Sequence, residues 1–464
     1  MAPRCLGWLP FRQGYSNEKT DWMRWAIVLL LFWGVAYSLT IPLFESPDEP
    51  AHFARAYGIS EGQFILKDSP RHLVLFFYEE LKKQHRHEII SMMDQLLVEF
   101  PGRVRFIAPN TAMYSPVPYL FHALIVKSVT LFGESNFLLT FSVYLCRLTS
   151  LFLFLSILYL SSKIAPFIFW PVFWIATTPM ALSQSAMVNL DFIILGACVI
   201  LLAASFGDLM FSSFVGWASI SACVLLLTKP PYAPFLLIPA VSAVMLKRVS
   251  RPQATGVILG VFLIPLFAAA AWNGMMVSQG LMNDFSALLW KYGALHIDPL
   301  AQLAYIKAYP LKFIQIIWNT LCNNGVMYLH QFVGILGWQD IPVPFWIVVL
   351  WVVLAPLAIG ITDQTDLTFQ TRFVLLSICI MVSVLILIFV FASAYMIWMP
   401  VGADSVNVQG RYFHPVAAVC FVGITLIISS GGNQKHYSWR RPVLLGAASL
   451  IHSISIITLF QKYA

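Results

Sequence analysis

Three ionisable side chains, Asp48, Glu49 and His52, lie within five residues of one another, directly after the first hydrophobic segment of the chain. Only 11% of the residues are charged, so this concentration is the first place to look for chemistry. A carboxylate in such a group can act as a general base, and its neighbours tune its charge. If the stretch is helical, Asp48, His52 and Arg55 follow at i, i+4 and i+7 and share one face.

The stretch Ser46-Pro-Asp-Glu-Pro50 allows two helix starts. Ser46 as N-cap with Glu49 three residues later forms a capping box, which is a purely structural role. Pro50 weakens this interpretation because it has no N–H to donate. A helix that begins at Pro50 instead leaves Asp48 and Glu49 at its positive end, where carboxylates stay ionised. A plain helix start and a functional acidic site are both open at this point.

The composition is that of a multi-pass membrane protein. Hydrophobic residues make up 59% of the chain, the mean hydropathy is +0.77, and apolar runs of about 20 residues recur. The net charge of +7 is modest, and its basic residues gather at segment ends. They indicate orientation signals and contacts with membrane lipids, with no nucleic-acid partner. The seven scattered cysteines show no metal or disulfide spacing.

The chain divides into an N-terminal tail over 1–21, expected in the cytoplasm, and one transmembrane domain over 22–464. Basic residues before the first segment place its start inside, so the polar interval 44–115 is expected outside. Amphipathic stretches at 71–84 and 88–99 are expected to lie along the membrane surface.

Thirteen apolar segments are candidate crossings, and the expected fold is an all-α bundle of about 11 to 13 transmembrane helices: 22–43, 116–133, 139–162, 165–183, 188–210, 212–228, 231–247, 254–276, 312–335, 343–362, 372–397, 412–430 and 442–461. If all thirteen cross, the basic residues Lys247, Arg248 and Arg251 fall outside, against the positive-inside rule. The preferred topology runs 254–276 outward from an inner loop. Then 277–312 is a second external loop, and 312–335 and one earlier segment do not cross.

Several polar residues lie in or beside these segments. Arg147, inside an apolar run, is expected either to be paired or to reach the interface. Asp191 opens a segment and is either a helix cap or a substrate ligand. Lys229, before two prolines, is either an interfacial anchor or a cation for a phosphate. Tyr114-Ser-Pro-Val-Pro-Tyr119 is an entry turn or a rigid cavity wall.

The last polar cluster is Gln409-Gly-Arg-Tyr-Phe-His-Pro415. Arg411, after a glycine and before an aromatic pair, can hold a phosphate by two parallel hydrogen bonds. Gln409 and Tyr412 flank it and are candidates for substrate contact. The structural alternative is an interfacial Arg-Tyr anchor.

These motifs suggest a family. Pro-Asp-Glu-Pro-Ala-His-Phe after the first segment, Tyr-Ser-Pro-Val-Pro-Tyr, Gly334-Ile-Leu-Gly-Trp338 and Gln-Gly-Arg-Tyr-Phe-His-Pro resemble the bacterial DUF2142 family over roughly 45–430. That family looks like a relative of the GT-C glycosyltransferases. The resemblance implies a GT-C-like fold and an acidic residue in the first external loop. It also implies a polyprenyl-phosphate sugar donor and inverting transfer at the outer face.

Carried onto this sequence, the resemblance makes Asp48 the general base and Glu49 its catalytic partner. Arg411, Lys229 and Arg55 are the candidates to bind the donor phosphate, and a departing phosphate needs such cations. Candidate substrate contacts are His52, Tyr114, Tyr119, Asp191, Gln409 and Tyr412. No cofactor is required, although the i, i+3 spacing of Glu49 and His52 keeps a divalent cation as an alternative.

The predicted function is transfer of a sugar from a polyprenyl-phosphate donor to a hydroxyl of a cell-surface glycan or glycolipid. The expected location is the bacterial inner membrane, with the site facing the periplasm or the cell exterior. The alternatives are a transporter or flippase of lipid-linked saccharides, which should show inverted repeats around a midplane site, and a polysaccharide polymerase or ligase.

Overall fold

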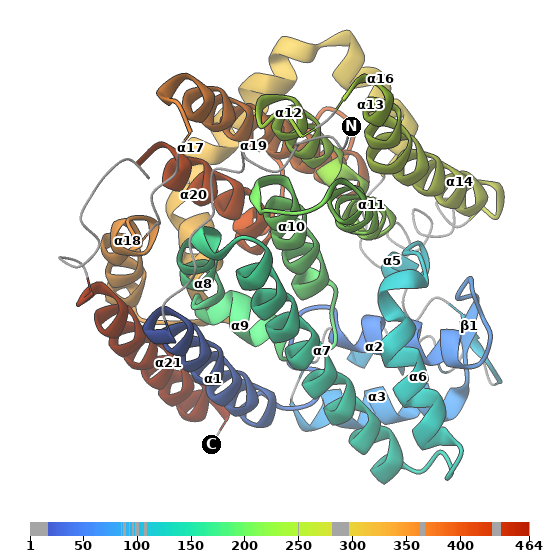
Figure 1. The fold of residues 1–464 in the computed structure, drawn as a ribbon. Coiled ribbons are helices and arrows are strands. Elements are labelled where there is room, and N and C mark those ends of the chain that lie inside the picture. Colours follow the sequence, from blue (N-terminus) through green and yellow to red (C-terminus); the bar gives the residue numbers. More distant parts are fainter. Residues whose placement is uncertain are drawn as a thin grey trace.

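The computed structural model of the protein describes residues 17–84, 86, 90–91, 93–94, 97, 102–105, 109–248, 250–280, 297–361, 367–428 and 438–463. In this part of the chain nearly every segment is helical (Figure 1). The first helix begins at Asn17, inside the stretch predicted as a tail, and residues 1–16 lie outside the described part. The predicted helix at 88–99 also falls largely outside it.

The helices, including short 3-10 and π turns marked η, are α1 (Asn17–Thr40), α2 (Glu49–Ser60), α3 (Arg71–Lys83), α5 (Pro109–Ala112), η1 (Val117–Tyr119), α6 (Leu120–Thr130), α7 (Asn136–Ile164), η2 (Pro166–Ile168), α8 (Phe169–Ala176), α9 (Pro179–Ser185), α10 (Asp191–Phe206), α11 (Phe211–Thr228), η3 (Pro230–Leu236), α12 (Leu237–Met245), α13 (Arg251–Val257), η4 (Ile258–Leu263), α14 (Ile264–Ser278), α16 (Pro299–Ala308), α17 (Pro310–Gly334), α18 (Phe345–Ile359), α19 (Phe369–Trp398), η5 (Gly410–Phe413), α20 (His414–Ile428) and α21 (Arg440–Tyr463). Two small antiparallel hairpins complete the fold: β1 (Asp68–Ser69) with β2 (Val104–Arg105), and β3 (Ile335–Leu336) with β4 (Ile341–Pro342). The chain is therefore a nearly all-α membrane protein, as predicted.

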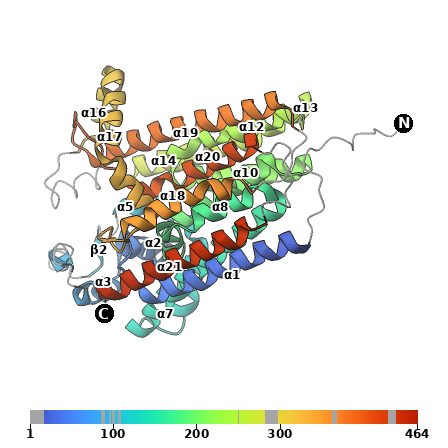
Figure 2. The same cartoon turned by 90° about the vertical axis from the view of Figure 1, so that its left-hand side faces the viewer.

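Each of the thirteen predicted apolar segments contains a helix. Among the described residues, seven helices are long and apolar enough to cross a membrane. A helix pair over 166–185, bent by 95° at its break, makes an eighth. Four shorter apolar helices, at 117–130, 191–206, 230–245 and 345–359, accompany them. By length and composition the described residues therefore give seven candidate crossings, or eight with the bent pair, fewer than the 11 to 13 expected, because several apolar segments form short or broken helices. The long axes of α1, α19 and α21 lie roughly parallel in Figure 2.

One end of this bundle is capped by arginines. Arg248 donates to carbonyls at the last turn of α10, Arg372 to one at the end of α20, and Arg440 to the carbonyl of Gly360 just after α18. Cations are favourable at helix C-termini because the unpaired carbonyls there are partly negative. We call this the arginine end. It contains Arg248, which the preferred topology placed inside.

Two apolar helices stay at the opposite end of the bundle. The Tyr119 hydroxyl, at the start of α6, lies 2.7 Å from Nδ1 of His52, and Glu134, just past its far end, accepts a 2.7 Å hydrogen bond from Tyr57. Both partners belong to α2, so α6 lies along α2 without reaching the arginine end. The long helix α17 is hydrogen-bonded to the loop after α19 through Thr320 and Tyr328. It is not among the described helices that are long and apolar enough to cross, in agreement with the preferred topology for 312–335.

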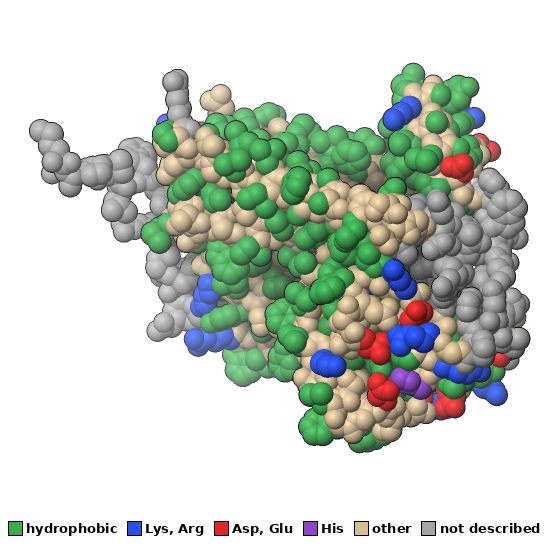
Figure 3. Space-filling model, turned by 90° about the vertical axis from the view of Figure 1, so that its right-hand side faces the viewer, with side chains coloured by type: hydrophobic (Ala, Val, Ile, Leu, Met, Phe, Trp, Pro, Cys, Tyr) green, Lys and Arg blue, Asp and Glu red, His purple; other side chains and the backbone are tan. Residues whose placement is uncertain are grey.

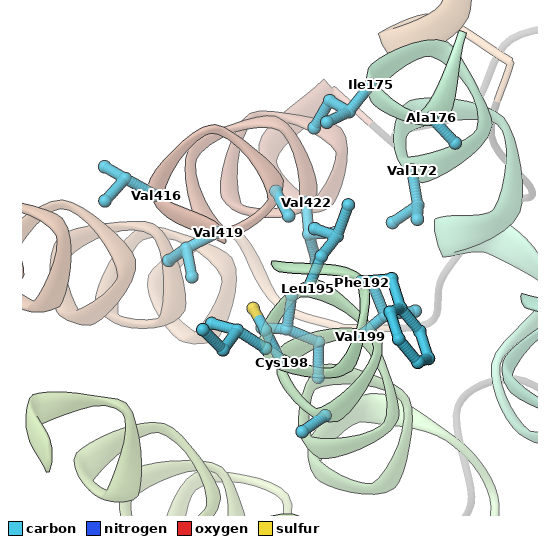
Figure 4. Close-up of a cluster of buried hydrophobic side chains, with 14 of the residues drawn as sticks. Val172, Ile175, Ala176, Phe192, Leu195, Cys198, Val199, Val416, Val419 and Val422 are labelled. Atoms are coloured by element: carbon cyan, nitrogen blue, oxygen red, sulfur yellow. The ribbon is translucent and has the colours of Figure 1, made fainter. Parts of the chain in front are cut away.

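Beneath this end, α8, α10 and α20 pack into a closely filled core (Figure 4). Val172 and Ile175 of α8 face Leu195 of α10 and Val419 and Val422 of α20, and all five side chains are buried. Inside a membrane such packing holds helices together by dispersion contacts. The core therefore fixes the first turns of α10 and α20, which carry the polar residues described next.

Candidate functional site

Asp48 sits at the turn between α1 and α2 in a left-handed conformation, with φ of 62°. Helix α2 begins at Glu49 with Asp48 at its N-cap position, but the Asp48 side chain caps no backbone N–H. The capping box with Ser46 is therefore absent, because Ser46 instead accepts a hydrogen bond from Gln184. A left-handed aspartate costs roughly 1 kcal/mol, and such strain is characteristic of functional turns. Here it turns the Asp48 carboxylate away from the helix.

Glu49, the next residue, points in the opposite direction. Its carboxylate is fully buried and forms a two-pronged ion pair with Arg147 of α7, at 2.8 and 2.6 Å. The backbone N–H groups of Phe44 and Val188 also donate to it. Every N–H of the Arg147 guanidinium is used, because it also donates to three carbonyls at the end of α1. Arg147 is thus paired, and Glu49 is held where a substrate cannot reach it.

Arg411 is the hub of the more open cluster. Its NH2 donates to Asp48 Oδ2 at 2.9 Å, its NH1 donates to Gln184 at 3.1 Å, and its Nε donates to Gln409 at 2.6 Å. The same guanidinium lies 3.3 Å from Asp191 Oδ2. The side chain of Arg411 is 4% exposed, whereas that of Asp48 is 38% exposed. Asp48 and Arg411 are 363 residues apart in the sequence, and the fold brings them together at the solvent-accessible Asp48 carboxylate.

Lys229 and Asp191 extend the cluster. The Lys229 ammonium lies 3.4 Å from Asp191 Oδ1 and 3.9 Å from the centre of the Tyr412 ring. Asp191 opens α10, and Lys229 lies in the break between α11 and the Pro230–Leu236 turn. Asp191 thus contacts both cations, Arg411 and Lys229. One connected cluster thus joins Asp48, Asp191, Lys229, Gln409, Arg411 and Tyr412, and Glu49 lies outside it. Asp191 and Arg411 border a small recess.

Gly410 lets the chain bring Arg411 into this position. A Cβ atom on Gly410 would lie 2.2 Å from the carbonyl oxygen of Tyr328 and 2.7 Å from Cβ of Gln331. The Gly410 N–H donates to the side chain of Gln331 at 2.8 Å. His414, one turn further, is hydrogen-bonded to the carbonyl of Phe332 and to Thr178. Helix α17 therefore holds the backbone on both sides of Arg411.

The Asp48 turn is clamped from the outside. Buried Glu45 pairs with Arg86, which also contacts Asp340 at 3.0 Å in the β3–β4 hairpin. Trp338 of the same hairpin donates to the carbonyl of Phe44 at 2.8 Å. With Glu49 and Arg147 on its inner side, the Asp48 turn is fixed from both directions.

His52, Tyr114 and Tyr119 form an aromatic wall beside the cluster. His52 stacks on Tyr114, with ring centres 6.1 Å apart, and is hydrogen-bonded to Tyr119. Burial is the main cause that lowers the pKa of His52, to about 4, and the nearby Asp48 and Asp191 only partly oppose it. His52 is therefore neutral at neutral pH.

Arg55 does not face the recess. It is buried and donates to the carbonyls of Gln63, Phe64 and Tyr114. These bonds use its guanidinium to hold the loop after α2, so its predicted role in phosphate binding lacks the geometry. A cation site at Glu49 and His52 also lacks it, because Glu49 is sealed by Arg147. Among the described residues no group of three or more metal-ligating side chains occurs.

The recess itself is small and mixed in character. A pocket at its base is lined by Gln184, Asp191, Arg411, Tyr232 and His414, with apolar walls from α9, α10 and α20. Arg411, Asp191 and the Gln184 amide converge there, and ion pairs join Asp48 and Lys229 to them. Such a set can bind an anionic group and present a carboxylate to a hydroxyl.

The family profile described as "Predicted membrane protein (DUF2142)" matches residues 31–420, which is most of the chain. The chain belongs to the DUF2142 family. The match includes the Asp48 turn, Arg147, Asp191, Lys229 and Arg411, so the whole cluster of this DUF2142 protein lies within the family's shared region. No curated protein and no solved structure matches the chain.

Three residues that organise this DUF2142 site were not predicted as site residues. Gln184 bridges Arg411 and Ser46 and also accepts from Asn189 at 2.8 Å. Gln184 was recognisable in the sequence because it is an amide within an apolar stretch. Glu45 and Gln331 gave none, because their partners, Arg86 and the backbone of Gly410, are distant in the sequence.

Proposed function

We propose that this protein is a membrane glycosyltransferase that takes a sugar from a polyprenyl-phosphate donor and attaches it to a hydroxyl of a cell-surface glycan. The observation that carries this proposal is the 2.9 Å contact between Asp48, whose side chain is 38% exposed, and Arg411, which lines the small recess. It joins the group best suited to activate an acceptor hydroxyl with the group best suited to hold a phosphate.

Arg411 and Lys229 supply the positive charge for the donor. Asp191 contacts both cations, and Gln409 also binds the Arg411 side chain. Preorganised cations of this kind stabilise the negative charge that develops on a departing phosphate. Tyr412 holds the Lys229 ammonium beside Asp191 by a cation–π contact.

Asp48 acts as the general base. In the resting protein its carboxylate pairs with Arg411, and the donor phosphate competes for the same guanidinium. Once the phosphate has bound Arg411, Asp48 accepts the proton of the acceptor hydroxyl. The hydroxyl oxygen bonds to the anomeric carbon, the bond from that carbon to the phosphate oxygen breaks, and the lipid phosphate leaves with the electron pair. Attack from the face opposite the phosphate inverts the anomeric centre.

Glu49 has a positioning role in this scheme. Sealed against Arg147, it anchors the first turn of α2 and so sets the direction of the neighbouring Asp48. Tyr114, which is partly exposed, would contact the sugar or the acceptor, since aromatic side chains line such binding sites. His52 and Tyr119 are buried and hydrogen-bonded to each other, so they support Tyr114 from behind.

The depth of the site suits a membrane-embedded donor. Helix α10 has 16 residues from Asp191 to the arginine end, which is about 24 Å at 1.5 Å per residue. The hydrocarbon core of a bilayer is about 30 Å thick. If the arginine end faces the cytoplasm, the recess lies at the level of the outer leaflet of the bacterial inner membrane and opens to the periplasm. A lipid-linked phosphate would lie near that depth.

The location of the charges favours a transferase over a flippase. A transporter is expected to hold its substrate near the membrane midplane, whereas Asp48, Asp191, Lys229 and Arg411 all gather at one end of the bundle. A polymerase or ligase would use the same end and differs in the length of the glycan transferred.

The proposal is tested by comparing surface glycans from cells that lack the gene with those of cells carrying a wild-type copy. Mass spectrometry should show one sugar residue missing without the gene and restored with it. Accumulation of a complete lipid-linked saccharide inside the membrane would support a flippase. Loss of the whole long-chain glycan would support a polymerase or ligase, and unchanged glycans would refute all three functions.

A further inference from the structure

Helix α17 has three distinct faces along its 25 residues. One face is buried against the protein and includes Phe313, Ile316, Thr320 and Tyr328. These residues recur at helical spacing and contact the loop after α19, where Thr320 and Tyr328 are both hydrogen-bonded to the backbone of Val406. The other faces of the helix carry most of its exposed side chains.

The second face is exposed and apolar. Leu311, Ile314, Trp318, Cys322 and Leu329 follow at i, i+3, i+7, i+11 and i+18, which places them in one stripe along the helix. Leu311 is 85% exposed and Trp318 66% exposed. We call this the apolar stripe of α17.

The third face is exposed and polar. Lys312, Gln315, Asn319 and Asn323 each come one residue after a member of the apolar stripe, so they form a second stripe about 100° around the helix. Val326, which is exposed, is the one apolar residue in line with them. A helix with a buried face, an apolar exposed face and a polar exposed face does not suit a position surrounded by lipid tails or one surrounded by water.

The orientation of α17 explains this pattern. Figure 2 shows α16 and α17 lying across the long axes of α1, α19 and α21, at the end of the bundle that carries the recess. Gln302 of α16 donates to the carbonyls of Tyr395 and Pro400, so this unit is fixed to the last turn of α19. In Figure 3 the unit formed by α16 and α17 projects at the upper right, at the border of the apolar flank of the bundle.

We propose that α17 lies in the plane of the membrane and inserts its apolar stripe into the leaflet nearest the recess. The stripe continues the apolar surface of the bundle that faces lipid tails, and the polar stripe then faces water. Trp318, Lys307 and Lys312 are residues favoured at the boundary between lipid and water. Since α17 ends beside Gly410, the anchored helix and Arg411 belong to one rigid unit.

Site-directed spin labelling tests this placement. Single cysteines are introduced at positions 311, 318 and 329 in an otherwise cysteine-free background, and the purified protein is reconstituted in nanodiscs of phosphatidylglycerol and phosphatidylethanolamine. Power saturation with oxygen and a nickel chelate gives the depth of each label. Because all three residues are exposed, the substitutions leave the buried contacts intact. Asn319→Cys, one residue from Trp318, is the matched control.

The in-plane helix predicts the same shallow membrane depth for labels at 311, 318 and 329, and a water-accessible label at 319. A helix that crosses the bilayer would give depths that change steadily over about 27 Å between 311 and 329. That result would overturn the proposal. Labels that are all exposed to water, or all shielded from both reagents by another protein, would overturn it as well. None of these outcomes depends on the proposed transferase activity.

Discussion

Arg147 and Arg411 each hold one carboxylate of the dipeptide Asp48-Glu49, but in contrasting surroundings. Arg147 and Glu49 are both fully buried, and protein groups use every donor of the arginine. Arg411 is almost as buried and also contacts Asp191, yet its partner Asp48 is more than a third exposed. Two adjacent acidic residues therefore lie in different surroundings. The sealed ion pair holds the turn, and the open one is the pair to which the proposed function assigns the substrate.

The backbone causes this difference. The left-handed conformation of Asp48 turns its side chain toward Arg411, while Glu49 starts a regular helix and faces Arg147. Removing one partner of a sealed pair leaves a buried charge and costs more stability than removing one partner of an open pair. The following predictions test this contrast.

Asp48→Asn should give the largest effect on activity. The amide keeps the shape of the side chain but cannot accept the acceptor proton, so transfer should fall about 1,000-fold, within the range for loss of a general base. The measurement is the restoration of the surface glycan in cells that lack the gene, at matched protein levels. Asp404→Asn, at an exposed carboxylate of the same end of the bundle, should restore the glycan fully. Full restoration by Asp48→Asn would remove Asp48 from the mechanism.

Glu49→Gln should mainly affect stability. It leaves the Arg147 charge buried without its counter-ion, which costs about 3 to 5 kcal/mol. Unfolding in mild detergent with increasing dodecyl sulfate should therefore occur at a much lower midpoint than for wild type. Asp48→Asn should unfold near the wild-type midpoint. Equal stability losses for both variants would contradict the distinction between a sealed and an open ion pair.

Gly410→Ala tests whether the position of Arg411 depends on the close contact between Gly410 and α17. The added methyl group collides with the backbone of α17, and the overpacking should cost about 1 to 3 kcal/mol and displace Arg411. Glycan restoration should drop while the protein still folds. Gly446→Ala, where nothing lies within 4 Å of the added atom, is the control and should behave as wild type. Wild-type activity of Gly410→Ala would show that α17 does not position Arg411.

His52 should produce the smallest effect, on the pH dependence of stability. Because burial lowers its folded-state pKa to about 4, the unfolded chain binds more protons between roughly pH 6.5 and 4. The contribution of neutral His52 is present above that window and is lost as the pH falls through it. His52→Asn should therefore flatten the decline of stability with falling pH. An unchanged slope would show that His52 is not buried as a neutral group.

The sequence predicted the helices better than their contacts. Periodic apolar runs identified all thirteen helical segments, and charge bias correctly placed Arg248 opposite Asp48. The motifs also named Asp48, Asp191, Lys229 and Arg411, which the fold brings together. Glu49 and Arg55 were assigned to the site because they neighbour Asp48, but their partners, Arg147 and the loop carbonyls, are set by tertiary packing. No local pattern identifies such partners.

The most direct measurement is the affinity of the purified protein for polyprenyl monophosphate in nanodiscs, compared among wild type, Asp48→Asn and Arg411→Lys. If the phosphate replaces Asp48 at Arg411, removing the competing carboxylate should leave the affinity unchanged or raise it. Arg411→Lys, which loses the two-pronged donor, should lower it about 10-fold or more. Weaker binding by Asp48→Asn, or unchanged binding by Arg411→Lys, would contradict a shared phosphate site at this pair.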